Sequence, residues 1–198
     1  MKAPPRPDPR FLTLFVDASF CHRTHAAGYG AWAKKATFEK GLIFGGRLTR
    51  GISNAGEAEL GGIALALRHL LEREHLAGLD RLMVQSDSLR SLQLISQVLP
   101  GVRIANHAEA AAVTKAQLAP SAMEAKALVA IKARVEQVDL LVRHVRGHKG
   151  GHQRQWVNRM CDAEARRNML AERARLDGEV DATRLIPSAK DETLGSGL

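Results

Sequence analysis

The sequence lacks a disulfide framework, a targeting segment and any internal repeat. Its only two cysteines are Cys21 and Cys161, which indicates a reducing compartment, and we expect a cytoplasmic location. The first ten residues hold four prolines but no apolar core, so they do not resemble a signal peptide. No run is long and apolar enough to span a membrane, so we expect no membrane partner.

Positive charge is the least ordinary property of the composition. The 198 residues carry a formal net charge of +8 with a pI near 10.0, whereas a hydrophobic content of 45% and a charged content of 25% are common in globular proteins. A field of this sign is typical of proteins that bind nucleic acid. A solvated basic surface without any ligand is the alternative interpretation.

The chain divides into three regions, and its length fits one domain with flanking segments. Residues 1–10 predict an extended proline-rich arm, because proline disfavours the helix. Residues 11–175 predict one folded domain. Residues 176–198 mix charges with glycine and proline and lack periodicity, which predicts a flexible tail. We expect a monomer.

Hydrophobic patterning within residues 11–175 predicts five strands and about four helices. The strands are 11–16, 28–33, 41–48, 80–86 and 138–145, and the helices are 57–72, 89–98, about 121–137 and 156–175. Short connections favour an antiparallel meander of the first three strands, and the strand–helix–strand order that follows favours parallel pairing. The predicted fold class is α/β: a five-stranded mixed sheet, with a three-strand meander plus two parallel strands, flanked by about four helices.

Four acidic residues lie where this pattern places strand ends and helix starts. Asp17 and Asp87 follow apolar strands, and Glu59 and Asp162 open alanine-rich helices. Carboxylates held in this way can converge into one patch, which repels itself unless cations neutralise it. Ligand sets made only of oxygen select Mg²⁺ or Mn²⁺. The sequence therefore predicts a two-metal nuclease.

Short motifs around these acids occur in a definite order. They are Asp17-Ala18-Ser19, Asn54 with Ala58-Glu59-Leu60, Ser86-Asp87-Ser88, Arg146-Gly147-His148, and Asn158 with Cys161-Asp162-Ala163-Glu164-Ala165-Arg166. Over roughly residues 11–175 the chain resembles type 1 ribonuclease H (ribonuclease HI). The ribonuclease H-like fold of that family agrees with the predicted element order.

The resemblance implies an Mg²⁺-dependent endoribonuclease, a hydrolase that cuts the RNA strand of RNA–DNA hybrids and leaves 3′-hydroxyl and 5′-phosphate ends. The family uses two Mg²⁺ ions, and we expect Mn²⁺ to substitute for them. By the family pattern Asp17 bridges the ions, Glu59 and Asp87 hold one side, and Asp162 holds the other. Residues 11–175 would then be the catalytic domain.

Glu57 is a second candidate for the helix position in this ligand set. We choose Glu59 because Leu60 follows it, as the family's Ala-Glu-Leu motif requires. A solvated surface acid or a helix cap is the alternative for each carboxylate. That alternative explains neither Asp17 nor Asp87, because a carboxylate gains little from ending an apolar strand.

His148 follows a glycine in a glycine-rich loop, and the resemblance implies that it assists catalysis by proton transfer or product release. A loop histidine without a role is the alternative. The loop is longer than the family pattern, which makes His152 a rival for the same role.

Two groups of histidine and cysteine raise a zinc site as an alternative. The first group is His144, His148, His152 and Cys161, and the second is Cys21, His22 and His25. Glycines interrupt the spacing of the first group, and no Cys-x-x-Cys pair exists, so we favour the carboxylate site.

Substrate-binding residues are less clearly encoded. The resemblance places Ser19, Asn54 and Ser88 near the nucleic-acid backbone, where small polar groups suit contacts with 2′-hydroxyls or the minor groove. Each of them also fits a turn or a helix cap. The family's basic phosphate-binding protrusion is not recognisable in residues 100–120.

A basic set further along the chain predicts a replacement phosphate track. Its members are Lys126, Lys132, Arg134, Arg143, Arg146, Lys149 and Arg154. We assign Trp32 and Trp156 to the core rather than to stacking platforms.

Two functions remain open beside hybrid cleavage. One is a nuclease of the same fold that acts on another structured nucleic acid, either double-stranded RNA or DNA. The other is a catalytically silent nucleic-acid-binding module. The complete set of four carboxylates argues against the second, since a binding module has no use for an anionic cluster that faces phosphate.

Overall fold

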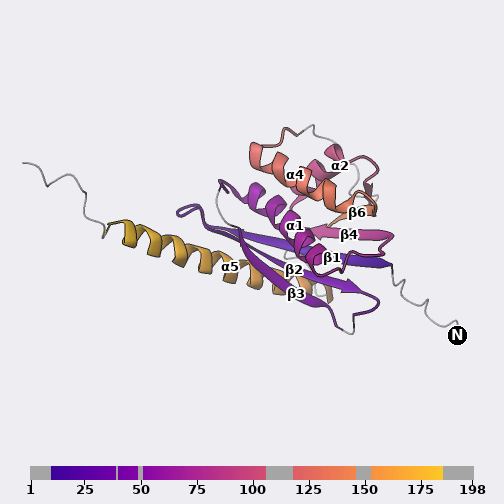
Figure 1. Cartoon of the computed structure of the whole chain (residues 1–198), viewed down its shortest axis with the longest axis horizontal. Helices are drawn as coiled ribbons and strands as arrows, with labels where there is room; N and C mark the ends of the chain where they lie inside the picture. The colour runs from indigo at the N-terminus through magenta and orange to yellow at the C-terminus, as the bar shows by residue number, and fades with distance from the viewer. Residues whose placement is uncertain (1–9, 39, 49–50, 106–117, 146–152, 185–198) are drawn as a thin grey trace, which may run out of the picture.

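The structure, a computed structural model, describes residues 10–38, 40–48, 51–105, 118–145 and 153–184. Within these ranges a single mixed sheet lies between helices on its two faces (Figure 1). The sheet contains six strands in the order β3-β2-β1-β4-β6-β5. The predicted mixed α/β sheet is confirmed, but the predicted number of five strands is wrong. No helix in the described ranges is long and apolar enough to cross a bilayer.

The first three strands form the predicted antiparallel meander. They are β1 (Phe11–Phe20), β2 (Ala27–Lys35) and β3 (Leu42–Leu48), with β2 paired to both of the others. β1 continues well beyond its apolar run because its second half also pairs with β2. Asp17 therefore lies inside β1, opposite Gly30, and not at the strand end where the sequence pattern places it.

The other strands are parallel to β1. β4 (Arg81–Ser86) pairs with β1, and β6 (Asp139–His144) pairs with β4, as the strand–helix–strand order predicts. The sixth strand, β5 (Arg103–Ile104), pairs with β6 at the edge of the sheet. Two residues are too few to show a hydrophobic period, so sequence patterning gave no sign of β5.

Four helices within the described ranges flank the sheet. α1 (Ala55–Glu72), α2 (Leu89–Val98) and α4 (Ala122–Val135) lie on one face, and α5 (Gln153–Arg184) lies on the other (Figure 1). The predicted capping box is present at the start of α4. Aliphatic side chains fill the space between the sheet and the first three helices, and the largest fully buried ones are Leu12, Leu14, Leu60, Ile63, Leu67, Leu70, Leu82, Leu92, Leu94, Ile95, Leu128 and Ile131.

Glycines let a helix approach β2 closely from each face. A Cβ on Gly62 of α1 would lie 2.9 Å from the Cβ of Tyr29, and a Cβ on Gly30 would lie 2.1 Å from the carbonyl oxygen of Cys161 in α5. Neither distance leaves room for a side chain. α5 is therefore pressed onto the strand that runs beside Asp17, which fixes the distance between this helix and the middle of β1.

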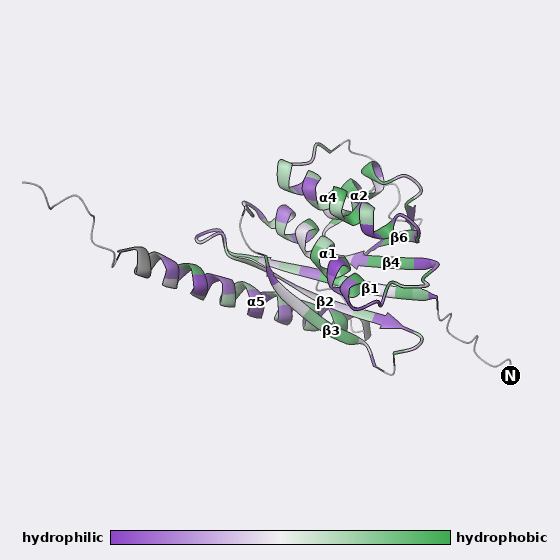
Figure 2. Ribbon diagram, in the orientation of Figure 1, coloured by the Kyte–Doolittle hydropathy of each residue, from purple (hydrophilic) through white to green (hydrophobic). Residues whose placement is uncertain are grey.

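α5 is longer than the sequence pattern predicts, because it continues to Arg184. Ion pairs four residues apart, Arg173 with Asp177 and Arg175 with Glu179, stabilise its outer half. Figure 2 shows mostly hydrophilic colours along this half, which explains why a search for apolar periodicity does not find it. The predicted start of the C-terminal tail therefore falls inside α5.

Candidate active site

Three of the four predicted carboxylates meet where β1 and β4 approach the start of α1. Asp17 comes from the middle of β1, Glu59 comes from the second turn of α1, and Asp87 directly follows β4. One carboxylate oxygen from each residue lies within 4.8 Å of the other two. Across the described residues this is the only group of three or more acids, histidines or cysteines that is close enough to share a metal ion.

The fourth carboxylate lies beside this group without joining it. Asp162 is exposed on the third turn of α5. It follows Cys161, whose backbone carbonyl oxygen packs against Gly30 of β2. It is close enough for its charge to raise the pKa of Asp17. Neither Asp162 nor Glu59 lies in the first turn of its helix, so the prediction that both open helices is wrong.

Burial and mutual repulsion strongly perturb two of the carboxyl groups. Asp17 is only 7% exposed, and burial, followed by the charges of Asp87 and Asp162, raises its pKa from 3.8 to about 7. Burial, followed by the charges of Asp17 and Asp87, raises the pKa of Glu59 from 4.5 to about 9. The backbone N–H of Ala18 donates to both carboxyls and offsets only part of these shifts.

The residues of this site fit a divalent metal ion. The Oε2 atom of Glu59 is buried and has no hydrogen-bond partner among the described residues. A buried carboxylate oxygen without a partner is costly, and two neighbouring carboxylates increase that cost. A bound cation would remove both penalties. Because every candidate metal ligand in this group is a carboxylate oxygen, the site suits hard ions such as Mg²⁺ or Mn²⁺.

Glu57 does not take part in the carboxylate cluster. Its carboxylate accepts hydrogen bonds from the backbone N–H and the hydroxyl of Ser53, at 2.8 and 2.7 Å, and from the hydroxyl of Ser121, at 2.7 Å. These bonds connect the start of α1 to the N-cap of α4. The choice of Glu59 over Glu57 therefore agrees with the geometry.

Two of the predicted substrate contacts also cap helices. The side-chain oxygen of Asn54 accepts from the backbone N–H of Glu57 at 3.0 Å and caps α1. The hydroxyl of Ser88 accepts from the backbone N–H of Ser91 at 3.3 Å and caps α2. Ser19 lies within β1 and is partly exposed. The cap interpretation is thus correct for Asn54 and Ser88, and it leaves room for a substrate contact.

Several of the predicted site residues follow β6 in the sequence. The predicted site residues His148 and Arg146, and the rival His152, lie outside the described residues. The structure adds His144 at the end of β6, whose Nε2 lies 3.1 Å from the backbone carbonyl oxygen of Asp87. In the sequence, His144 is marked only as a possible zinc ligand, and its place at the end of a central strand is the signal that could indicate the contact.

The described parts of the chain show no zinc site at the predicted groups. Cys161 is a buried, free thiol beside a backbone carbonyl of β1, and burial raises its pKa. His22 and His25 each contact the ring of Phe20 edge to face. Neither histidine is gathered with other metal-ligating side chains in these ranges.

The basic residues predicted as a phosphate track lie on different faces of the molecule. Lys132 and Arg134 belong to α4, whereas Arg143 of β6 lines a groove on the face that carries α5. Lys132 is exposed, but a guanidinium N–H of Arg134 donates to the carbonyl oxygen of Ala130 in its own helix. These described members therefore do not share one surface, and their contacts with phosphate stay a prediction.

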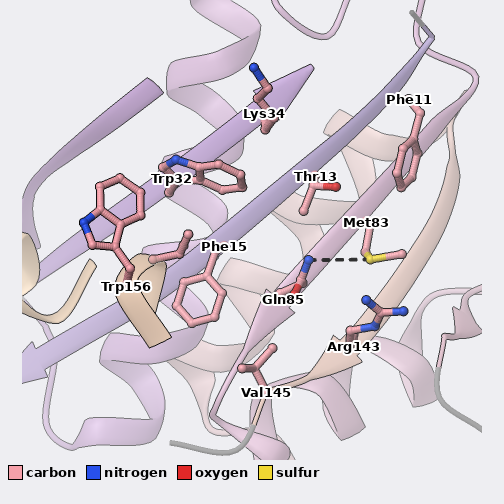
Figure 3. A pocket seen from close by; sticks show the side chains of 11 residues that line it. Phe11, Thr13, Phe15, Trp32, Lys34, Met83, Gln85, Arg143, Val145 and Trp156 are labelled. Carbon is pink, nitrogen blue, oxygen red and sulfur yellow. Dashed lines mark hydrogen bonds between the residues drawn. The ribbon is translucent and has the colours of Figure 1, made fainter. Parts of the chain in front are cut away.

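The assignment of both tryptophans to the core is wrong. Trp156 is 50% exposed, and Trp32 is partly exposed. Both line the same groove on the α5 face (Figure 3).

The model of the RNase H family matches residues 9–169, a range that includes all four predicted carboxylates. The chain belongs to the RNase H family. The resemblance found in the motifs is therefore confirmed, and the last part of α5 lies beyond the RNase H match. A search of curated proteins gave no match.

Solved RNase H structures share this fold at low sequence identity. RNase H1 from the halophilic archaeon Halobacterium salinarum is 13% identical, covers 80% of this chain and 97% of its own, and has a TM-score of 0.56. The N-terminal RNase H domain of rv2228c from Mycobacterium tuberculosis is 17% identical, with coverages of 83% and 97% and a TM-score of 0.55. LC11-RNase H1, in complex with an RNA/DNA hybrid, is 13% identical, with coverages of 80% and 96% and a TM-score of 0.52.

Proposed function

We propose that this RNase H hydrolyses the RNA strand of RNA–DNA hybrids as an Mg²⁺-dependent endonuclease and leaves 3′-hydroxyl and 5′-phosphate ends. The observation that carries the proposal is the cluster of Asp17, Glu59 and Asp87 in a chain of the RNase H family. Within this cluster, a buried oxygen of Glu59 has no hydrogen-bond partner among the described residues. The solved complex of LC11-RNase H1 with an RNA/DNA hybrid supports the choice of substrate.

The four carboxylates would hold two Mg²⁺ ions. Asp17 would contribute a ligand to both ions, Glu59 and Asp87 would help to hold one of them, and Asp162 would help to hold the other. When bound, such ions activate a water and neutralise charge on the phosphate and the leaving oxygen. The task of the chain is to hold Asp17 on a central strand and Glu59 on a packed helix, so that neither carboxylate can relax away from its neighbours. Binding of the metal ions must also displace protons from Asp17 and Glu59, because both carboxyl groups have raised pKa values.

Other residues would position the substrate and move protons. His148 is proposed, from its motif alone, to transfer a proton or assist product release. Ser19, Asn54 and Ser88 are proposed to contact the nucleic-acid backbone or a 2′-hydroxyl beside the cluster. The proposed phosphate contacts are Lys132, Arg134 and Arg146. We further propose that residues 11–175 are sufficient for catalysis and that the protein acts as a monomer.

The decisive experiment compares labelled duplexes of one sequence. The purified chain should cut the RNA strand of an RNA–DNA hybrid in Mg²⁺ or Mn²⁺ and should be inactive in EDTA, while double-stranded RNA and double-stranded DNA stay intact. An Asp17→Asn preparation, purified in parallel, controls for nucleases carried over from the expression host. Equal cleavage of double-stranded RNA or DNA would contradict hybrid specificity, and binding without cleavage would indicate a silent binding module.

A further inference from the structure

An open groove lies on the part of the sheet that α5 leaves uncovered. It has a volume of about 690 Å³ and crosses β2, β1, β4 and β6, with the start of α5 closing one end (Figure 3). A volume of this size is within the range of about 300–1,000 Å³ that ligand sites occupy. The carboxylates are not among the residues that line it.

Aromatic side chains are concentrated in this groove. The chain has only five phenylalanines, two tryptophans and one tyrosine. Four of these eight residues line the groove, namely Phe11, Phe15, Trp32 and Trp156. Large aromatic side chains are normally well buried, yet Trp156 is 50% exposed. A chain so poor in aromatic residues has therefore placed both of its tryptophans on one accessible surface.

The floor and wall of the groove are held in place by their neighbours. Phe15 is 3% exposed and forms part of the floor. The indole ring of Trp32 packs against Gly41, where a Cβ would lie 2.1 Å from the indole nitrogen. The amide of Gln85 donates to the sulfur of Met83 at 3.6 Å (Figure 3). The aromatic surface is thus formed in advance of any ligand, which lowers the entropic cost of binding.

Positive charge flanks the aromatic floor on both sides. Lys34 comes from β2 and Arg143 comes from β6, and none of the described residues that line the groove is acidic. β1 and β4 lie between these two strands, so β2 and β6 are three strand spacings apart, roughly 14 Å. An occupant that complements this surface has flat apolar rings at its centre and negative charge toward its edges.

The groove leads toward the carboxylate cluster along two elements. Phe15 precedes Asp17 by two residues in β1, so the two side chains leave the same face of the sheet. Trp156 precedes Asp162 by six residues in α5. A chain-like ligand in the groove would therefore run toward the site at which the proposed reaction takes place.

We propose that this groove binds single-stranded nucleic acid, with one or two bases stacked on Trp32 and Trp156 and with the adjoining phosphates near Lys34 and Arg143. Aromatic platforms flanked by cations bind single strands without strong sequence preference. A duplex does not fit this chemistry, because its bases are already stacked on each other and offer no faces. The choice of nucleic acid over an acidic peptide rests on the proposed function, since the groove adjoins the carboxylates.

The test measures binding of a single-stranded oligothymidylate of eight nucleotides to the full-length chain in EDTA. Because both tryptophans of the chain line the groove, quenching of intrinsic fluorescence reports binding at this surface directly. Trp156→Ala should weaken binding by about tenfold or more. Leu170→Ala, which removes a comparably exposed apolar side chain from the same helix outside the groove, should leave binding unchanged.

Salt dependence provides the second readout. The double variant Lys34→Gln with Arg143→Gln should flatten the slope of log affinity against log salt by about 0.7, one phosphate contact on a single strand, because Lys34 also donates to the carbonyl oxygen of Phe38. A second contact would bring the change to about 1.4. Binding without quenching, or equal affinity of the Trp156→Ala and Leu170→Ala variants, would overturn the proposal. If a peptide of alternating glutamate and leucine quenched the fluorescence at a lower concentration than the oligothymidylate does, the proposal would be overturned in favour of a protein partner.

The proposal for the groove and the proposed function can be refuted independently of each other. The oligothymidylate assay involves no cleavage, and the Asp17→Asn variant should bind the oligonucleotide at least as tightly as the unchanged chain, because a negative charge near the end of the groove is lost. Failure of hybrid cleavage would refute the proposed function and leave this binding result intact. Loss of binding with intact cleavage would refute the groove alone.

Discussion

At the scale of single residues, the active site is a concentration of negative charge that destabilises the metal-free fold. The substitution Asp17→Asn should reduce hybrid cleavage by at least about 10³-fold, because the metal centre contributes several kcal/mol to catalysis. It should also raise the melting temperature in EDTA, since it removes a buried charge beside Asp87 and Asp162. Asp177→Asn, in the exposed outer half of α5, is the control: it should leave cleavage unchanged and lower the melting temperature only slightly, because its ion pair with Arg173 is exposed. Measurable Mg²⁺-dependent turnover by Asp17→Asn would rule out its role as bridging ligand.

The raised pKa values give the metal-free protein a characteristic pH dependence. Asp17 and Glu59 have folded-state pKa values of about 7 and about 9, against ordinary values of 3.8 and 4.5. Between these limits the folded state binds more protons than the unfolded state, so the free energy of unfolding falls as pH rises. The melting temperature in EDTA should therefore decrease from pH 5 to pH 9, and Asp17→Asn should reduce the decrease mainly below pH 7. A melting temperature that stays constant or rises over this range would contradict the burial of these groups.

His148 and His152 follow β6 in the sequence, and each is a candidate for the catalytic histidine. His148→Ala should lower turnover by roughly 10²-fold or less, because an acid–base assistant contributes less than the metal ions. His152→Ala should have little effect. Steady-state cleavage of one hybrid by both variants is the measurement. A larger loss for His152→Ala would transfer the role to that residue.

Among residues, the carboxylates could be predicted because their neighbours in the sequence identify them, whereas the tryptophans could not. The order of motifs around Asp17 and Asp87 indicates chemistry without any coordinates. A tryptophan carries no such context, and its size favours burial, so the sequence alone predicts Trp156 in the core. Its exposure depends on α5 stopping short of the β4 side of the sheet, which is a property of tertiary packing.

At the scale of elements, the contact between α5 and β2 positions Asp162 relative to Asp17. In Gly30→Ala the new Cβ would lie 2.1 Å from the carbonyl oxygen of Cys161, so α5 must shift. The expected cost is about 1–3 kcal/mol of stability, with a loss of cleavage even well below the melting temperature. Gly178→Ala is the control, because nothing lies within 4 Å of its Cβ position.

The control substitution should behave in the opposite way. Alanine is the better helix former by up to about 1 kcal/mol, so Gly178→Ala should raise the melting temperature slightly and leave cleavage unchanged. Thermal melts and cleavage rates of both variants test the pair. If Gly30→Ala melted and cleaved like the unchanged chain, close packing of α5 on β2 would not be what holds Asp162 near the cluster.

Polar contacts join the starts of the helices on the other face. Ser121 caps α4 and also donates to Glu57 in the first turn of α1. Glu124, which completes the capping box of α4, accepts two hydrogen bonds of 2.8 Å from Arg90 in α2. These contacts bring the first turns of three helices together beside Glu59. The order of strands and helices could be predicted from periodicity, but this junction could not, because it connects residues that are 34 to 64 positions apart.

The elements that the sequence pattern missed share a physical cause. β5 has two residues, and the outer half of α5 is stabilised by charged side chains rather than by an apolar face. Hydrophobic periodicity reports only elements that bury one face over several turns or residues. Asp17 was placed at a strand end for the same reason, because β1 continues through polar residues that pair with β2.

At the scale of the whole molecule, the two surfaces that we propose for nucleic acid lie on different faces of the sheet. α1, α2 and α4 cover one face of the sheet (Figure 1). The aromatic groove lies on the other face, and the carboxylates lie where β1 and β4 meet α1. A duplex that crosses the cluster on the α4 side and a single strand that leaves along the groove would not compete for the same surface. The net charge of +8 favours both.

Hybrid binding should therefore depend on salt through specific cations and not through net charge alone. In the Asp17→Asn background in EDTA, the double variant Lys132→Gln with Arg134→Gln should flatten the slope of log affinity against log salt by about one unit, since each phosphate contact on a B-form duplex contributes about 0.9. We expect one contact and not two, because Arg134 already donates to Ala130 in its own helix. The control, Arg68→Gln with Arg173→Gln, removes the same charge from residues that each pair with an acid four positions on, and its slope should not change. Equal slopes for the two double variants would show that α4 does not contact the hybrid and that the phosphate contacts are made elsewhere on the chain.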